Sequence, residues 1–332
     1  MNPYAVMAAV QSLRGIAVRT PMLTSSVFDA LVARRVWVKA ENQQRTGSFK
    51  LRGAYNAVAS LGDQDRGRGV IGASSGNHAQ ALALAARLHE VPATVVIPAD
   101  VPKVKRQAIV ALGADIVTYN RRMGRRDAVV SELAHRRRLA VVPSASDPAV
   151  VAGAGTVAWE MLQEVPDLVA IFVPVGGGGL AAGSALAALG HNPSVKVIGV
   201  EPAVADDTFR SLREGRQISI PPPTTVADGL THTEPPRLTF DINRRLLGNI
   251  VTVSEQEITD AMAHLWRYYR SAAEPSGAVA LAGLLQMADR LPEGPIGVVL
   301  SGGNVDWGTY RGLLDIAMTR TETEPHDATV LH

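Results

Sequence analysis

Cysteine is missing altogether from the 332-residue chain. Its absence excludes disulfide bonds, thiolate catalysis and cysteine-ligated metal sites. It also permits a reducing compartment, and we expect the protein to work in the cytoplasm.

A dominant charge and long apolar runs are missing too. The 33 Lys and Arg residues nearly balance 31 Asp and Glu residues, which leaves a formal net charge of +2 and argues against a general nucleic-acid surface. No apolar run approaches the roughly 20 residues of a membrane span. The first 14 residues lack the basic-then-apolar layout of a signal peptide. We therefore expect neither a nucleic acid nor a membrane as a partner.

What the chain does contain is enough apolar residues, 46%, for two domains or one large α/β unit. One series of elements has strands at 69–73, 93–97, 115–119 and 140–143 and helices at 77–88, 102–112 and 126–138. A second series has strands at 168–175, 195–200, 250–253 and 296–300 and helices at 150–164, 180–189, 255–269 and 276–288. Strands separated by helices of this length predict parallel βαβ units.

Three stretches lie outside these two series. The first 14 residues have the pattern of an amphipathic helix, with Val6, Val10 and Leu13 facing inward. Residues 36–39 predict a short strand that leads towards Lys50. Residues 319–332 are polar and unpatterned, and we expect them to form a tail without regular structure.

Lys50 follows the short polar stretch Thr46-Gly47-Ser48-Phe49 and precedes a helical pattern. Thr46 or Ser48 is expected to cap that helix, which places Lys50 in the first turn. A cation is disfavoured at the positive end of the helix dipole, so the pKa of Lys50 should fall below its usual value of roughly 10.4. A neutral amine is nucleophilic and forms Schiff bases. The alternative is an ordinary solvated lysine.

Four consecutive glycines, Gly176 to Gly179, lie between the strand at 168–175 and the helix at 180–189. This layout is typical of phosphate binding, because glycine lets backbone N–H groups approach an anion at a helix N-terminus. A turn without a ligand is one alternative. A dinucleotide site is another, since Gly176, Gly178 and Ala181 satisfy G-x-G-x-x-A and the next strand ends at Glu201.

The run from Glu41 to Ala54 resembles the cofactor-lysine signature of the fold-type II pyridoxal phosphate enzymes, in the branch of serine/threonine dehydratases and serine racemases. The resemblance extends from about Arg19 to about Leu314. It implies two parallel-sheet αβα domains with the cofactor in the cleft between them: a large domain (1–52 and 148–318) and a small one (53–147). This reading uses both the lysine and the glycines, whereas the dinucleotide reading leaves the lysine unexplained.

The same resemblance implies which residues contact the cofactor. Lys50 would hold its aldehyde carbon and the four glycines its phosphate. Ser301 would face the pyridine nitrogen, and a neutral hydroxyl there favours elimination over transamination. The remaining expected cofactor contacts are Phe49, Asn77 and Glu274.

The expected substrate contacts lie in two places. The loop Ser74-Ser75-Gly76-Asn77-His78 matches the family segment that grips the substrate α-carboxylate, at a strand-to-helix junction. Ser75 corresponds to the second acid/base of serine racemases, or it is only a helix cap. The chain departs from the family in a basic run at 120–126. There Arg126 either recognises a second acidic group on the substrate or belongs to a solvated loop.

A divalent-cation site is the last expectation from the resemblance, with Glu201, Asp207 and the Ala205 carbonyl as ligands. Oxygen-only ligands suit Mg²⁺ or Ca²⁺. The alternative is a helix start enriched in acidic residues.

The resemblance predicts β-elimination from a β-hydroxy amino acid such as L-threonine or L-serine, giving a 2-oxo acid and ammonia. Alternatives on the same scaffold are threo-3-hydroxyaspartate ammonia-lyase and serine racemase activity. A carrier of pyridoxal phosphate and a nicotinamide dehydrogenase are readings from other classes. The family expectation is a homodimer, and the lack of a C-terminal effector domain resembles the short, catabolic threonine deaminases.

Overall fold

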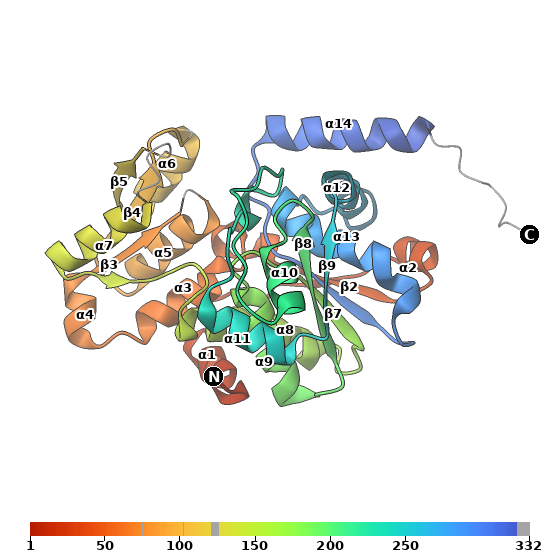
Figure 1. The fold of residues 1–332 in the computed structure, drawn as a ribbon, viewed down its shortest axis with the longest axis horizontal. Coiled ribbons are helices and arrows are strands. Elements are labelled where there is room, and N and C mark those ends of the chain that lie inside the picture. The colour runs from red at the N-terminus through yellow and green to blue at the C-terminus, as the bar shows by residue number, and fades with distance from the viewer. Residues whose placement is uncertain (75, 102, 121–125, 324–332) are drawn as a thin grey trace, which may run out of the picture.

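A six-stranded sheet and a four-stranded sheet form the framework of the computed structural model, which describes residues 1–74, 76–101, 103–120 and 126–323 (Figure 1). The larger sheet has the order β1-β2-β10-β7-β8-β9, and only the β1–β2 pair is antiparallel. Its strands are β1 (Met22–Leu23), β2 (Val36–Ala40), β7 (Ala170–Pro174), β8 (Lys196–Pro202), β9 (Asn249–Val253) and β10 (Ile296–Leu300).

The smaller sheet is wholly parallel, in the order β5-β4-β3-β6. Its strands are β3 (Val70–Ala73), β4 (Ala93–Pro98), β5 (Asp115–Tyr119) and β6 (Ala140–Val141). Two sheets of parallel strands confirm the predicted α/β fold. All four strands lie between residues 53 and 147, and we propose these limits for the smaller domain and the flanking parts of the chain for the larger one.

Helices connect the strands and cover both sheets. Those that precede or belong to the smaller unit are α1 (Pro3–Ser12), α2 (Ser26–Val32), α3 (Lys50–Ala59), α4 (Asp63–Arg68), α5 (Asn77–Leu88), α6 (Lys103–Ala111) and α7 (Arg126–Arg137). Those that follow are α8 (Pro148–Glu164), α9 (Gly179–His191), α10 (Asp207–Glu214), α11 (Arg237–Leu246), α12 (Glu255–Tyr269), α13 (Pro275–Met287) and α14 (Trp307–Thr323). Figure 1 shows α4–α7 around the smaller sheet and α8–α14 around the larger one.

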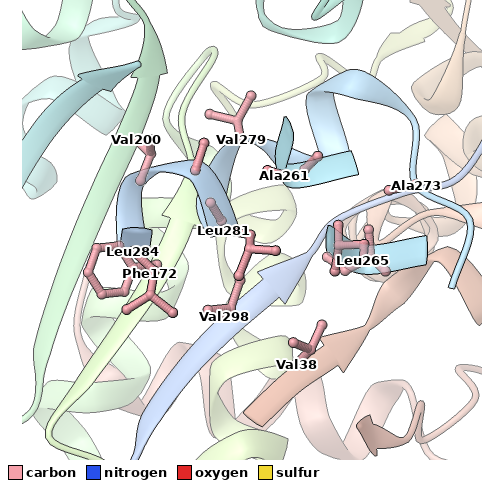
Figure 2. Packing of buried hydrophobic residues seen from close by; sticks show 14 of the residues in the cluster. Val38, Phe172, Val200, Ala261, Leu265, Ala273, Val279, Leu281, Leu284 and Val298 are labelled. Atoms are coloured by element: carbon pink, nitrogen blue, oxygen red, sulfur yellow. The ribbon is translucent and has the colours of Figure 1, made fainter. Parts of the chain in front are cut away.

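The larger sheet is buried on both faces. Phe172 packs with residues of α12 and α13 in one core cluster, whereas its neighbours Ile171 and Val173 belong to a second cluster with α8 and α9. Figure 2 shows the first cluster, where Val38, Phe172, Val200 and Val298 point from adjacent strands towards Leu281 of α13. Strands buried on both faces read as continuous apolar runs, which is why the sequence predicted them.

Several helices differ from the sequence-based expectation. The short helices α2, α4 and α11, of 6 to 10 residues, were not predicted, and α10 was foreseen only as the helix start that was the alternative to the metal site. The expected tail was wrong for residues 319–323, which continue α14, while 324–332 lie outside the described residues. This helix buries Tyr310, Leu314 and Ala317 at i, i+4 and i+7, an apolar face that its polar neighbours conceal in the sequence. In the described part of the chain, no helix combines the length and apolar character of a membrane span.

Candidate active site

The expected site residues follow the carboxyl ends of parallel strands, where ligand sites form in open α/β sheets. In the larger sheet, β10 ends just before Ser301, and β7 ends just before the glycine loop, Gly176 to Gly179. Strand β2 leads through two 3₁₀ turns to Lys50. In the smaller sheet, β3 ends at Ala73, before the loop 74–78. Site residues therefore come from the carboxyl ends of strands in both sheets.

Lys50 is the first residue of α3, as predicted, but the expected cap is wrong. Phe49 occupies the N-cap position and makes no side-chain capping bond. Thr46 has a left-handed backbone with φ of 66°, and the buried Ser48 hydroxyl has no hydrogen-bond partner among the described residues. Thr46 and Gly47 both have positive φ, and the chain turns there. Thr46 and Ser48 therefore both precede the N-cap position that Phe49 occupies.

The Lys50 amine bridges the two sheets. It donates a hydrogen bond of 3.1 Å to the carbonyl oxygen of Ser144, just after β6 of the smaller sheet. It also lies 4.8 Å from the centre of the Phe49 ring. Burial lowers the pKa of Lys50 from its ordinary value of 10.5 to about 8, and the negative charge of Glu274 opposes this effect. The amine therefore becomes neutral far more readily than that of a surface lysine.

The glycine loop is closely enclosed by neighbouring side chains. A Cβ atom at Gly177 would lie 2.7 Å from the Ala145 Cβ, and one at Gly178 would lie 2.6 Å from the Asn243 Nδ2. Gly178 has a left-handed φ of 75° and precedes α9 without a capping side chain. The first N–H groups of α9 therefore remain available for an anion. No larger residue fits this cradle.

Asn77 links the smaller sheet to the larger one. Its amide nitrogen donates a hydrogen bond of 2.6 Å to the Glu274 carboxylate, and its amide oxygen accepts one of 2.7 Å from Asn304. A Cβ atom at Gly302 would collide with the Glu274 carboxylate. Asn304 was not singled out from the sequence, although it follows Ser301-Gly302-Gly303 directly.

Ser301 joins this group through the backbone. Its carbonyl accepts a hydrogen bond of 3.1 Å from the Phe49 amide, and Ser48 pairs with Gly302 in a β-bridge. The residue after β10 and the residue before Lys50 are thus held together. Phe49, Lys50, Asn77, Glu274 and Ser301 form one connected cluster. The glycine loop joins it through Ala145, which follows the Ser144 acceptor of Lys50 and lies against Gly177.

The loop 74–78 is only partly described, because Ser75 lies outside the described residues. The Ser74 hydroxyl accepts a hydrogen bond of 3.2 Å from the Gly76 amide. His78 is buried, and its Nε2 donates a hydrogen bond of 2.9 Å to the Val142 carbonyl. Burial and the charge of Lys50 lower the pKa of His78 to about 4, so the ring is neutral and orients the loop.

His232 is a residue of the site that sequence analysis missed. Its ring contacts the glycine loop, since a Cβ atom at Gly177 would lie 2.8 Å from its Nε2 and one at Gly176 would lie 3.2 Å from its Nδ1. Burial, together with the charges of Lys50 and Arg126, lowers the pKa of His232 to about 4. It lies in the loop before α11, without a local motif that could have identified it.

Arg126, at the start of α7, stands apart from the cluster. Its guanidinium binds the adjacent Asp127 at 2.8 Å, and 55% of its side chain is exposed. Its charge nevertheless reaches His232 beside the glycine loop. The neighbouring basic residues 121–125 lie outside the described residues.

Of the three expected metal ligands, Glu201 lies in β8, Ala205 in the loop that follows, and Asp207 at the first position of α10. Glu201 and Asp207 are buried, and Glu201 accepts hydrogen bonds of 3.2 and 2.8 Å from the Thr208 and Phe209 amides. The Asp207 Oδ2 atom is buried without a partner in the described residues. Burial raises the pKa of both carboxyl groups, that of Asp207 to about 7. A buried Glu201 bonded to α10 is not free to bind a ribose hydroxyl, which removes the dinucleotide reading.

The lowered pKa of Lys50 has a measurable consequence in the cofactor-free protein. The rate at which pyridoxal forms a visible absorbance band should rise with pH through about 8, because only the neutral amine attacks an aldehyde. Stopped-flow absorbance between pH 6 and 11 measures this rate, with Lys50→Arg as the blank. A midpoint near 10.5 would show that Lys50 titrates like a surface lysine.

Comparison with known proteins agrees with this geometry. Residues 13–302 match the family described as pyridoxal-phosphate dependent enzyme. The chain is 42% identical over 309 residues to the L-threo-3-hydroxyaspartate ammonia-lyase of Saccharomyces cerevisiae, which covers 93% of this chain and 95% of that protein. It is 38% identical over 298 residues to the L-threonine ammonia-lyase of Thermotoga maritima, covering 90% of this chain and 74% of that protein. The crystal structure of serine racemase from Dictyostelium discoideum aligns with a TM-score of 0.87 at 37% identity, over 92% of this chain and 99% of the other. This chain belongs to the pyridoxal-phosphate dependent enzymes of fold type II.

Proposed function

We propose that the protein is an ammonia-lyase that uses pyridoxal phosphate to eliminate water from a β-hydroxy amino acid. The released enamine tautomerises and takes up one water again, which gives a 2-oxo acid and ammonia. One observation carries the proposal: a partly buried lysine amine of lowered pKa bonds the Ser144 carbonyl, and the next residue, Ala145, lies against the uncapped glycine loop. The named activities of the relatives, on threonine and on hydroxyaspartate, support the same reaction type.

The residues present fit pyridoxal phosphate. The glycine loop is a cradle that any Cβ atom would fill, and the free N–H groups at the start of α9 suit a phosphate. Lys50 supplies the amine that holds the aldehyde carbon. Ser301 would face the ring nitrogen, and Phe49, Asn77 and Glu274 would surround the ring.

Pyridoxal phosphate, when bound, supplies an aldehyde that condenses with amines and a ring that withdraws electrons from the substrate α-carbon. Lys50 then acts as the general base, because burial keeps its amine poised to release and accept a proton near neutral pH. The N–H groups at the start of α5 bind and orient the substrate α-carboxylate, with Ser74, Gly76, Asn77 and His78 shaping that loop.

Racemisation is the second reading on this scaffold. It requires an acid on the face opposite Lys50, and Ser75 is the residue we propose for it. A neutral Ser301 hydroxyl beside the ring nitrogen favours loss of the β-hydroxyl over a long-lived carbanion, which supports elimination as the main reaction. Chiral analysis of recovered serine distinguishes the two.

Replacing Lys50 with alanine should abolish both the visible absorbance of the bound cofactor and the formation of 2-oxo acid from L-threonine, since Lys50 is the lysine of this cluster in the described part of the chain. Lys196→Ala, an exposed lysine at the start of β8, is the matched control and should keep both. Turnover that survives in Lys50→Ala would end the assignment of Lys50.

Hydroxyaspartate as the preferred substrate is a second candidate, favoured by the charge around His232. Arg126 acts on His232, which touches the glycine loop, so a cation lies within electrostatic reach of the cluster. A guanidinium there suits the β-carboxylate of 3-hydroxyaspartate. The hydroxyaspartate ammonia-lyase of Saccharomyces cerevisiae supports this choice.

The discriminating assay compares 2-oxo acid formation from L-threo-3-hydroxyaspartate and from L-threonine. Arg126→Ala should lower kcat/KM for hydroxyaspartate at least about tenfold more than for threonine, because a charge-assisted hydrogen bond is lost. Arg136→Ala, on the same helix and 62% exposed, serves as the control. Equal losses on both substrates would leave Arg126 without a part in selectivity.

We also propose a Mg²⁺ or Ca²⁺ site at Glu201, Asp207 and the Ala205 carbonyl. Among the described residues, no group of three or more His, Cys, Asp or Glu side chains is arranged for a metal, and the proposed set has only two carboxylates. The unpartnered Asp207 Oδ2 is the observation that supports a cation, since a buried carboxylate oxygen needs a partner.

Chelation should lower the melting temperature of the protein by at least about 2 °C, because a cation bound only to the folded state stabilises it. Asp207→Asn should melt at the same temperature with and without chelator. Asp241→Asn, a carboxylate on α11 whose side chain is 38% exposed, should respond like the parent. An unchanged melting temperature of the parent would remove the site.

A cytoplasmic homodimer completes the proposal. The dimer is the expectation from the family resemblance, and the large side chains of Tyr4 and Trp307, 75% and 71% exposed, are accessible to a partner subunit. A monomeric mass in sedimentation would contradict the dimer.

A further inference from the structure

A fully buried guanidinium lies two residues beyond Lys50 and has no place in the chemistry above. Arg52 is 0% exposed, and all of its donors are used. Its Nε and Nη2 atoms bind the Glu41 carboxylate in a fork, each at 2.8 Å. Its Nη1 and Nη2 atoms bind Glu160 at 2.7 and 2.9 Å, and further bonds reach the Thr156 hydroxyl and the Val18 carbonyl.

Lys39 completes this group, which we call the Arg52 network: Lys39, Glu41, Arg52 and Glu160. The Lys39 amine donates to Glu160 at 2.6 Å and to the Thr20 carbonyl at 2.7 Å. Two cations and two carboxylates cancel, so the network carries no net charge. Removal of one member would leave an unpaired charge in the interior.

The network connects the elements that present the cofactor residues. Residues two positions apart on a helix differ by roughly 200° in direction, so Lys50 and Arg52 point to opposite sides of α3. Lys39 lies on β2 opposite Val299 of β10, two residues before Ser301. Glu160 lies on α8.

Helix α8 acts as a spacer between α3 and α9. On one side, a Cβ atom at Gly153 would collide with the Arg52 carbonyl oxygen. On another side, a Cβ atom at Gly155 would lie 2.5 Å from the Gly183 carbonyl oxygen. Helix α3 begins at Lys50 and α9 begins at Gly179. Both contacts are backbone to backbone, so the separation of the two helices has little freedom.

Stability alone does not account for the network. Buried ion pairs are often replaceable by apolar residues without loss of stability, because desolvation cancels much of the attraction. A fully bonded guanidinium fixes one orientation of the groups around it, because its planar donors fit two carboxylates in a single arrangement.

We propose that Arg52 is a positioning residue, which holds Lys50 at the distance from the glycine loop that one molecule of pyridoxal phosphate spans. The inference rests on the proposed assignment of Lys50 and the glycine loop to the two ends of the cofactor. A cofactor bound at both ends gains affinity only when the two anchors match its length. Arg52 therefore controls how much the phosphate adds to the affinity.

The test is the ratio of the affinities for pyridoxal phosphate and pyridoxal, which differ only in the end that reaches the glycine loop. Both dissociation constants are measured by visible absorbance after removal of cofactor from the full-length protein. In Arg52→Lys, which keeps the charge but loses the fork, this ratio should fall at least about tenfold.

The control is Phe28→Leu, which weakens the core cluster that Phe28 shares with α12 and with Val36 and Val38, on the face of β2 opposite Lys39. It should lower the melting temperature and leave the ratio unchanged. An unchanged ratio in Arg52→Lys, or an equal fall in both variants, would overturn the proposal. If Arg52→Lys does not fold, Glu160→Gln is judged by the same criteria. A parent protein without preference for pyridoxal phosphate would overturn the assignment of the glycine loop, and the positioning role with it.

Discussion

The chemistry that we propose depends on one partly buried lysine amine that contacts no carboxylate among the described residues. Lys50 donates to the carbonyl oxygen of Ser144, a neutral acceptor that does not hold the ammonium form. The nearest acidic influence, Glu274, accepts a short hydrogen bond from Asn77 instead. Burial therefore outweighs attraction, and the pKa of Lys50 falls to about 8. The rest of the site is arranged around an amine in this state.

A second buried lysine shows how much the partner matters. Lys39 lies in the same interior but contacts the Glu160 carboxylate at 2.6 Å. Burial lowers its pKa too, while Glu160 opposes the shift. Lys39 thus contacts a carboxylate and belongs to a charged network, whereas Lys50 bonds the carbonyl oxygen of Ser144. This difference in acceptor supports the proposed chemical role of Lys50.

Local patterns predicted the parts of the fold that are locally determined. The apolar runs of β7 and β10 and the helix that starts at Lys50 were predicted because their signals lie within a few residues. The cap was wrong because Thr46 adopts a left-handed backbone. Asn304 and His232 were missed because each meets the site through contacts with residues distant in the sequence, Asn77 and the glycine loop.

The sequence by itself determined the α/β class and the family, and it singled out the candidate lysine and the glycine loop, because each is contained in short runs of residues. Only the tertiary structure decided which charges meet. Strand β2 lies beside β10 although most of the chain separates them, and Arg52 binds Glu160 across 108 positions. Sheet order and helix packing bring these groups together, and neither property is contained in a local pattern, since both depend on how all the elements share one interior.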